Sequence, residues 1–140
     1  MASEKRLFFL LSKAHRKLFR HLDSACQQQL EVTLPQLGAL LFIGKHPGCP
    51  QKAVADALDL NKSAITGLLS RMEANGLIER RLDADDARVV KVFASDRGVQ
   101  KARTADPLIK ALNQEIGREF SEQEMATILR FLHFILDRFE

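Results

Sequence analysis

The stretch of residues 51–94 constrains the fold of this chain more than any other part of its sequence. Two segments with helical patterns, residues 51–58 and 62–75, are separated only by Asp59, Leu60 and Asn61. Asn61 is a residue type that caps helix N-termini, and Gly76, directly after the second segment, suits a helix C-terminus. Two short helices joined by such a turn form a helix-turn-helix.

A strand pattern follows the second short helix. Residues 79–82 and 89–94 together contain β-branched and aromatic side chains, and the polar loop 83–88 between them suits the tip of a hairpin. A helix-turn-helix followed by a hairpin has the element order of a winged helix. We therefore expect a mainly α fold with a small β-hairpin wing.

Two helices are predicted before this region. Apolar residues recur at helical spacing over residues 4–29, which indicates a long amphipathic first helix. Thr33 and Gln36 form a capping box with Pro35 in the first turn, and this start predicts a second helix to about Gly44. Residues 46–50 contain two prolines and a glycine, so we expect a turn there.

Two more helices are predicted after the hairpin. Ser95 can cap the first of them, and Pro107 is expected to kink or break it near Ala105 and Asp106. Ser121 and Glu124 form a second capping box, which opens the last helix. Four apolar residues of this helix share one face: Ile128, Leu132, Ile135 and Leu136.

The phenylalanines concentrate in the terminal helices. Only Phe42 and Phe93 lie between these helices. The other seven of the nine lie within them: Phe8, Phe9, Phe19, Phe120, Phe131, Phe134 and Phe139. Large aromatics at both ends favour a subunit interface, although a helical cap within one chain is the alternative. We expect one domain over residues 1–140, with dimerisation helices at 1–31 and about 105–140, and a winged-helix region at about 33–104.

The second helix of the helix-turn-helix has an outward face of small, uncharged residues. Ser63, Gly67, Ser70 and Ala74 lie opposite four apolar residues, Ile65, Leu68, Leu69 and Met72. Such a face can enter the DNA major groove, where Ser63, Thr66 and Ser70 can bond base edges or phosphates. Lys62 and Arg71 can neutralise phosphates. The alternative is an ordinary helix whose small polar residues face solvent.

Arginines of the hairpin are further candidates for DNA contact. Arg88 lies near the tip, where it can reach the backbone or the minor groove, and Asp86 can hold its guanidinium in place. Arg80 and Arg81 lie at the hairpin base. For these two, phosphate contacts and plain salt bridges to Glu79 and Asp83 remain equal alternatives.

Several other classes of protein fit the sequence poorly. The apolar runs are too short to span a membrane, and no cleavable secretion signal is recognisable, so we expect a cytoplasmic protein. The net charge of +3 permits nucleic-acid binding without requiring it. No nucleophile elbow or phosphate-binding loop is present, and we expect no enzyme activity, metal or cofactor. Cys26 and Cys49 are expected to be plain thiols, with a redox or metal sensor as the alternative.

The chain closely resembles the MarR family, the multiple antibiotic resistance regulators. The resemblance rests on the order and spacing of three pieces: TLPQLGALLFI, QKAVADALDLNKSAITGLLSRMEANGLIERR and DADDARVVKVFASDRG. It implies that Lys62, Ser63 and Thr66 contact DNA from the recognition helix, and that Asp86 and Arg88 form the wing pair. It also implies a homodimeric repressor on a pseudo-palindromic operator, released by a small-molecule effector.

Two positions depart from the family pattern. Gly67 stands where many members have an arginine, and Ala87 replaces the first arginine of the usual wing pair. Losing one bidentate arginine removes about 1–3 kcal/mol of discrimination at one base pair. We expect Ser70 and Arg71 to replace part of it. The sparse base contacts also leave open a winged-helix protein that works through protein contacts.

Overall fold

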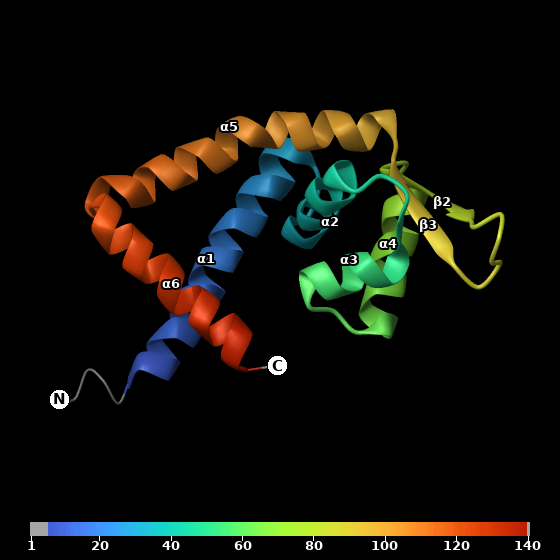
Figure 1. Ribbon diagram of the computed structural model, residues 1–140. Coiled ribbons are helices and arrows are strands. Elements are labelled where there is room, and N and C mark those ends of the chain that lie inside the picture. Colours follow the sequence, from blue (N-terminus) through green and yellow to red (C-terminus); the bar gives the residue numbers. More distant parts are fainter. Residues whose placement is uncertain (1–5, 140) are drawn as a thin grey trace. The chain divides into compact units, whose positions relative to one another are not determined.

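The computed structural model describes residues 6–139 (Figure 1). The chain forms two compact units, with the boundary between Ala105 and Asp106. The first unit contains α1 (Leu7–Leu30), α2 (Leu34–Lys45), β1 (Cys49–Pro50), α3 (Gln51–Leu58), α4 (Lys62–Ala74), β2 (Ile78–Leu82), β3 (Val90–Ala94) and the first turns of α5 (Asp96–Glu119). The second contains the rest of α5 and α6 (Glu122–Arg138). The predicted helix start at Glu4 lies outside the described residues.

The core of the first unit surrounds α2, a helix that is apolar on nearly all sides. Its start follows the predicted capping box, because Thr33 Oγ1 accepts from the Gln36 amide at 3.2 Å and Gln36 Oε1 accepts from the Thr33 amide at 3.0 Å. The side chains buried with it come from α1, α3, α4, β2 and β3. The largest buried side chains include Leu40 and Ile43 of α2 itself, and Leu30, Val54, Ile65, Leu69, Met72 and Val92 from its neighbours.

The turn between α3 and α4 is built as the sequence predicted. Asp59 adopts a left-handed conformation with φ of 54°, and the Leu60 amide donates back to the Ala55 carbonyl at 2.9 Å. Asn61 Oδ1 then accepts from the Ala64 amide at 2.8 Å and so caps α4. At the other end of α4, Gly76 has φ of 72°, and the Leu77 amide donates to the Met72 carbonyl at 2.9 Å.

The wing is part of a three-stranded antiparallel sheet with the strand order β1-β3-β2. The prediction that residues 46–50 form only a turn was wrong, because Cys49 pairs with Val92 and the Gly48 amide donates to the Val92 carbonyl at 2.9 Å. Pairing with this segment satisfies the backbone groups on the edge of β3 that faces away from β2. The two hairpin strands begin at Ile78 and Val90, each one residue from its predicted start.

Three consecutive carbonyls after the last turn of α4 accept hydrogen bonds from the start of α5. Arg97 Nη1 donates to the Asn75 carbonyl at 3.1 Å, and Ser95 Oγ donates to the Gly76 carbonyl at 2.6 Å. The Ser95 amide donates to the Leu77 carbonyl at 3.0 Å. Ser95 Oγ also accepts from the Gly98 amide at 3.1 Å, which confirms Ser95 as a helix cap.

Of the two outcomes expected at Pro107, a kink or a break, the break was wrong. α5 continues through Pro107 to Glu119, since proline removes a single amide donor and the hydrogen bonds on either side can hold the turn. The second unit ends in α6, whose predicted capping box is formed by Ser121 and Glu124 at 2.9 and 3.1 Å. Within the described chain, none of the α6 residues is buried.

Candidate nucleic-acid interface

The outward face of α4 is presented to solvent as predicted. Lys62, Ser63, Thr66, Ser70 and Arg71 are exposed, whereas Ile65, Leu68, Leu69 and Met72 are buried. Gly67 and Ala74 add no bulk to this face. The apolar side of the helix is packed into the core, and its outward face forms a smooth ridge. Such a ridge fits a groove about 12 Å wide.

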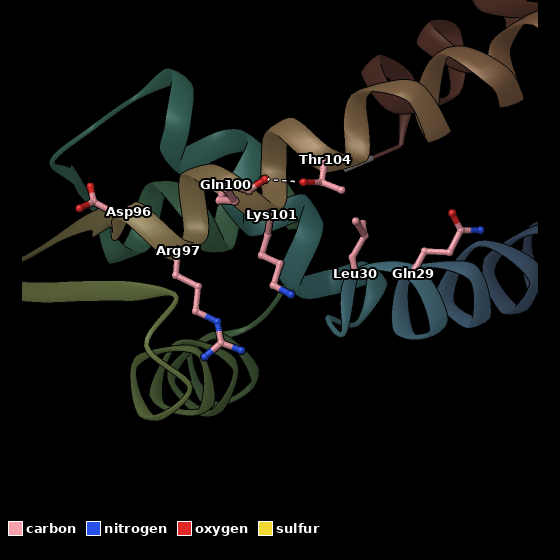
Figure 2. Close-up of a pocket in the computed structure, with 7 residues that line it drawn as sticks. All are labelled: Gln29, Leu30, Asp96, Arg97, Gln100, Lys101 and Thr104. Carbon is pink, nitrogen blue, oxygen red and sulfur yellow. Dashed lines mark hydrogen bonds between the residues drawn. The ribbon is translucent and has the colours of Figure 1, made fainter.

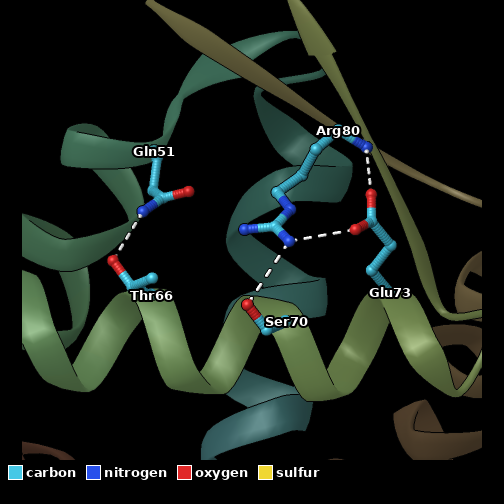
Figure 3. Close-up of polar contacts among 5 residues, drawn as sticks. All are labelled: Gln51, Thr66, Ser70, Glu73 and Arg80. Carbon is cyan, nitrogen blue, oxygen red and sulfur yellow. Dashed lines mark hydrogen bonds and ion pairs between the residues drawn. The ribbon is translucent and has the colours of Figure 1, made fainter.

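Thr66 is held by two hydrogen bonds within the protein. Its Oγ1 donates to the Lys62 carbonyl at 2.7 Å and accepts from Gln51 Nε2 at 3.1 Å (Figure 3). Gln51 is the first residue of α3 and was not among the predicted site residues. Because Gln51 and Thr66 lie on different helices, 15 positions apart in the chain, no local pattern could have indicated the contact.

Ser70 is engaged as well, by an arginine from the wing. Arg80 Nη2 donates to Ser70 Oγ at 3.3 Å and to Glu73 Oε1 at 2.9 Å, and the Arg80 amide donates to Glu73 Oε2 at 3.2 Å (Figure 3). The side-chain hydrogen bond from Arg80 lowers the pKa of Glu73. The predicted partners Glu79 and Asp83 were wrong for Arg80, because β2 runs alongside α4 and brings Glu73 closer. These bonds tie the base of the wing to α4.

The other hairpin arginine, Arg81, keeps one of its predicted partners. Its Nη2 lies 2.8 Å from Glu79 Oε2, and its guanidinium lies 4.6 Å from the centroid of the Phe93 ring. Asp83 instead pairs with Lys91 at 3.8 Å. Arg81 is thus held along the sheet, although more than half of its side chain is exposed.

Arg88 and Asp86 meet at the wing tip in a two-pronged contact. Arg88 Nε and Nη2 lie 3.1 and 3.3 Å from the two carboxylate oxygens of Asp86, and the Arg88 amide donates to Asp86 Oδ1 at 3.0 Å. The hydrogen bonds from the side chain and backbone of Arg88 lower the pKa of Asp86. The Arg88 side chain is nevertheless 91% exposed. Its guanidinium is oriented by a neighbour and remains open to a ligand.

Arg71 projects from the flank of α4 that faces away from Thr66 and folds back along the helix. Its Nη1 lies 3.4 Å from the point that a Cβ on Gly67 would occupy. It also lines a hollow of about 280 Å³, which we call the Arg71 hollow, with Phe19, Asp23, Thr33, Pro35, Gln36 and Leu68. Asp23 is already bonded to the Leu34 amide at 2.7 Å and to Gln27 at 2.8 Å. Arg71 therefore contributes the positive charge of this hollow.

A second hollow, of about 290 Å³, lies between the end of α1 and the first turns of α5 (Figure 2). Its two cations already have partners within the fold. Lys101 lies 3.8 Å from Glu31, and Arg97 donates to the Asn75 carbonyl. The described residues that line this hollow come from α1 and α5, so we assign it to the packing of these two helices.

The two thiols are buried, and burial raises the pKa of both Cys26 and Cys49. They are therefore protonated at neutral pH and poor nucleophiles. Among residues 6–139, no cluster of three or more His, Cys, Asp or Glu side chains is arranged to hold a metal ion. No helix in the same range combines the length and apolar character that crossing a membrane requires.

Known proteins resemble this chain over nearly its whole length. The sequence profile of the MarR family matches residues 30–89. The organic hydroperoxide resistance transcriptional regulator of Bacillus subtilis (strain 168) is 30% identical, over 95% of this chain and 93% of that protein. The S. aureus MepR-DNA complex has a TM-score of 0.88 at 22% identity, over 94% and 97% of the two chains. The PcaV regulator of Streptomyces coelicolor, solved with its natural ligand, has a TM-score of 0.78 at 24% identity, over 91% and 92%.

Proposed function

This chain belongs to the MarR family of winged-helix transcriptional regulators, and we propose that it is a homodimeric repressor that binds a pseudo-palindromic operator. The observation that carries the proposal is the pairing of two exposed elements within the first unit. α4 presents a smooth polar ridge for the major groove, and the hairpin presents the oriented, 91% exposed Arg88. MepR, one of the structural neighbours, was solved bound to DNA.

The site residues take different roles in this proposal. Lys62 and Ser63, at the start of α4, contact phosphates and base edges. Arg88, oriented by Asp86, enters the minor groove or meets the backbone. Ser70 contributes mainly through its bond to Arg80, which sets the angle between wing and recognition helix. Arg71 reaches the groove from the other flank, beside Gly67.

The proposed dimer rests on apolar surface in the terminal helices. Phe8 and Phe9 of α1 are 73% and 69% exposed, and Leu136 of α6 is 69% exposed. Leu132 shares a face with Leu136 and is also exposed. Apolar side chains gathered along two helices are typical of surfaces that a second subunit covers, and a two-fold dimer matches a palindromic operator.

A small anionic molecule in the Arg71 hollow is the proposed effector. The hollow joins α1 and α2 to the flank of α4, and binding there would draw the guanidinium of Arg71 away from DNA. PcaV is described with its natural ligand bound. The B. subtilis relative is named for organic hydroperoxide resistance, but the thiols of this chain are buried and protonated. We therefore propose release by ligand binding, without thiol oxidation.

Fluorescence anisotropy with the DNA that flanks the gene of this protein tests the proposal. We expect binding at least about a thousandfold tighter than to scrambled DNA of equal length. The affinity should fall steeply as salt rises, because each neutralised phosphate releases counterions. Equal, weak binding to both DNAs at every salt concentration would contradict the proposal and favour a scaffold that works through protein contacts.

Arg88→Ala is expected to weaken binding about tenfold and to lower the slope of log affinity against log salt by about one unit. The reason is that one oriented guanidinium is lost from the DNA contact. Arg103→Ala is the matched control, since it removes the same charge from an exposed position on α5. If both variants lower the affinity equally, then general charge explains the effect and the wing role of Arg88 is wrong.

A further inference from the structure

The bond between Gln51 and Thr66 has a consequence for base recognition. We propose that Gln51 is a specificity-determining residue, whose side-chain amide reads an adenine in the major groove, and that Thr66 is a positioning residue that holds this amide. The assignment rests on the proposed function, because it requires α4 to enter the major groove. It concerns a residue on the first helix of the motif, outside the recognition helix itself.

The hydrogen bonds of Thr66 leave its hydroxyl with no proton to offer. A hydroxyl has one hydrogen and two lone pairs. The hydrogen is donated to the Lys62 carbonyl at 2.7 Å, and one lone pair accepts from Gln51 Nε2 at 3.1 Å. Thr66 therefore presents its methyl group and a single remaining lone pair. The sequence predicted that Thr66 bonds a base edge or a phosphate, and any donor in such a contact must come from another group.

Gln51 can supply that donor. Its Nε2 carries two hydrogens, and one of them points to Thr66. Within residues 6–139, the structure gives no protein partner for its second N–H or for Oε1. Figure 3 shows the amide nitrogen turned toward Thr66 and the oxygen directed away. This orientation follows from chemistry, because the hydroxyl proton is already used and only the NH₂ group can face Thr66.

The pair of groups that remains on Gln51 matches one base. A glutamine amide that offers one donor and one acceptor side by side pairs with N7 and N6 of adenine in the major groove. Both residues of this pair adjoin packed parts of the fold. Gln51 directly follows β1, which pairs with β3, and Thr66 follows the buried Ile65 on α4. A side chain held in place before binding loses less rotamer freedom on contact with DNA.

The test begins with selection of operator sequences from random DNA by the wild-type dimer. The affinity of each variant is then measured for the selected site and for all single base-pair changes within one half-site. At one A·T pair, we expect the wild type to discriminate about tenfold to a hundredfold. Gln51→Ala should lose this preference and keep the preferences at the other positions. Gln100→Ala, at an exposed position of α5, is the matched control.

Variants of Thr66 separate positioning from direct reading. Thr66→Val removes the hydroxyl and keeps the shape, so it should weaken discrimination at the same base pair as Gln51→Ala. The double variant should lose nothing further there. Thr66→Ser keeps the hydroxyl and should retain the preference. Thermal unfolding and sedimentation of each variant test whether its fold and assembly match those of the wild type.

The outcomes distinguish this assignment from the proposed function. If the wild type enriches no sequence, the proposed function fails and the role of Gln51 fails with it. If the wild type enriches an operator but Gln51→Ala lowers the affinity for every site by the same factor, then Gln51 contacts the DNA backbone. That result overturns the assignment. An unchanged base preference in Gln51→Ala overturns it as well.

Discussion

Gly98→Ala is expected to lower the free energy of unfolding by about 2 kcal/mol, which corresponds to a fall in Tm of roughly 5–10 °C. A Cβ at this position would overlap the Leu77 carbonyl oxygen and would lie 2.9 Å from Leu40 Cδ2. The carbonyl cannot move freely, because it also accepts from the Ser95 amide at 3.0 Å. Alanine favours helices by about 1 kcal/mol over glycine, which offsets only part of the overlap.

Gly117→Ala provides the control on the same helix. Beyond its own helical turn and chain neighbours, no described residue has an atom within 4 Å of the Cβ that this substitution adds. It should therefore stabilise the protein by up to about 1 kcal/mol through helix propensity alone. Urea unfolding measures the free energy of unfolding of both variants. We expect it to fall in Gly98→Ala and to rise in Gly117→Ala. Equal stability changes in the two variants would show that α5 does not depend on close contact with Leu77.

Leu132→Glu is expected to convert the proposed dimer to monomers and to abolish specific operator binding at nanomolar protein. The two-fold symmetry of the proposed interface places the new carboxylate there twice, and an unpaired charge is costly to bury. We expect the dimer dissociation constant to rise at least about a hundredfold, since each buried charge costs several kcal/mol. Sedimentation equilibrium measures the assembly, and anisotropy measures the DNA affinity.

Gln123→Glu is the matched control for this experiment. It changes the net charge by the same amount, and at 100° per residue it lies on the opposite side of α6 from Leu132. Both positions are exposed in the single chain, so neither variant should unfold the subunit. A Leu132→Glu protein that still sediments as a dimer would place the subunit interface elsewhere.

Local chemistry explains which elements the sequence predicts well. The caps at Thr33, Asn61 and Ser121 each satisfy backbone amides within three residues, so their signal is contained in four consecutive letters. The burial of one side of α4 follows from helical periodicity in the same way. These local signals were enough to predict the helix-turn-helix and the hairpin in the correct order.

Most of the missed features depend on contacts between separate elements. β1 is two residues long and exists because β3 offers a free edge, which no pattern in residues 46–50 indicates. Arg80 has acidic neighbours in the sequence, yet it pairs with Glu73 across the gap between β2 and α4. Pro107 is the exception, because the break expected there is absent and α5 continues through this residue. Gln51 was overlooked because its partner lies on another helix.

The three hydrogen bonds between residues 75–77 and 95–97 bear on how a regulator of this kind can be switched. Together with the Arg80 bonds to Ser70 and Glu73, they join the recognition helix, the wing and the first turns of α5 into one hydrogen-bonded unit. We therefore expect these three elements to move together when the start of α5 moves. In the proposed dimer, such a movement would change the distance between the two recognition helices, so that they would no longer match the helical repeat of DNA.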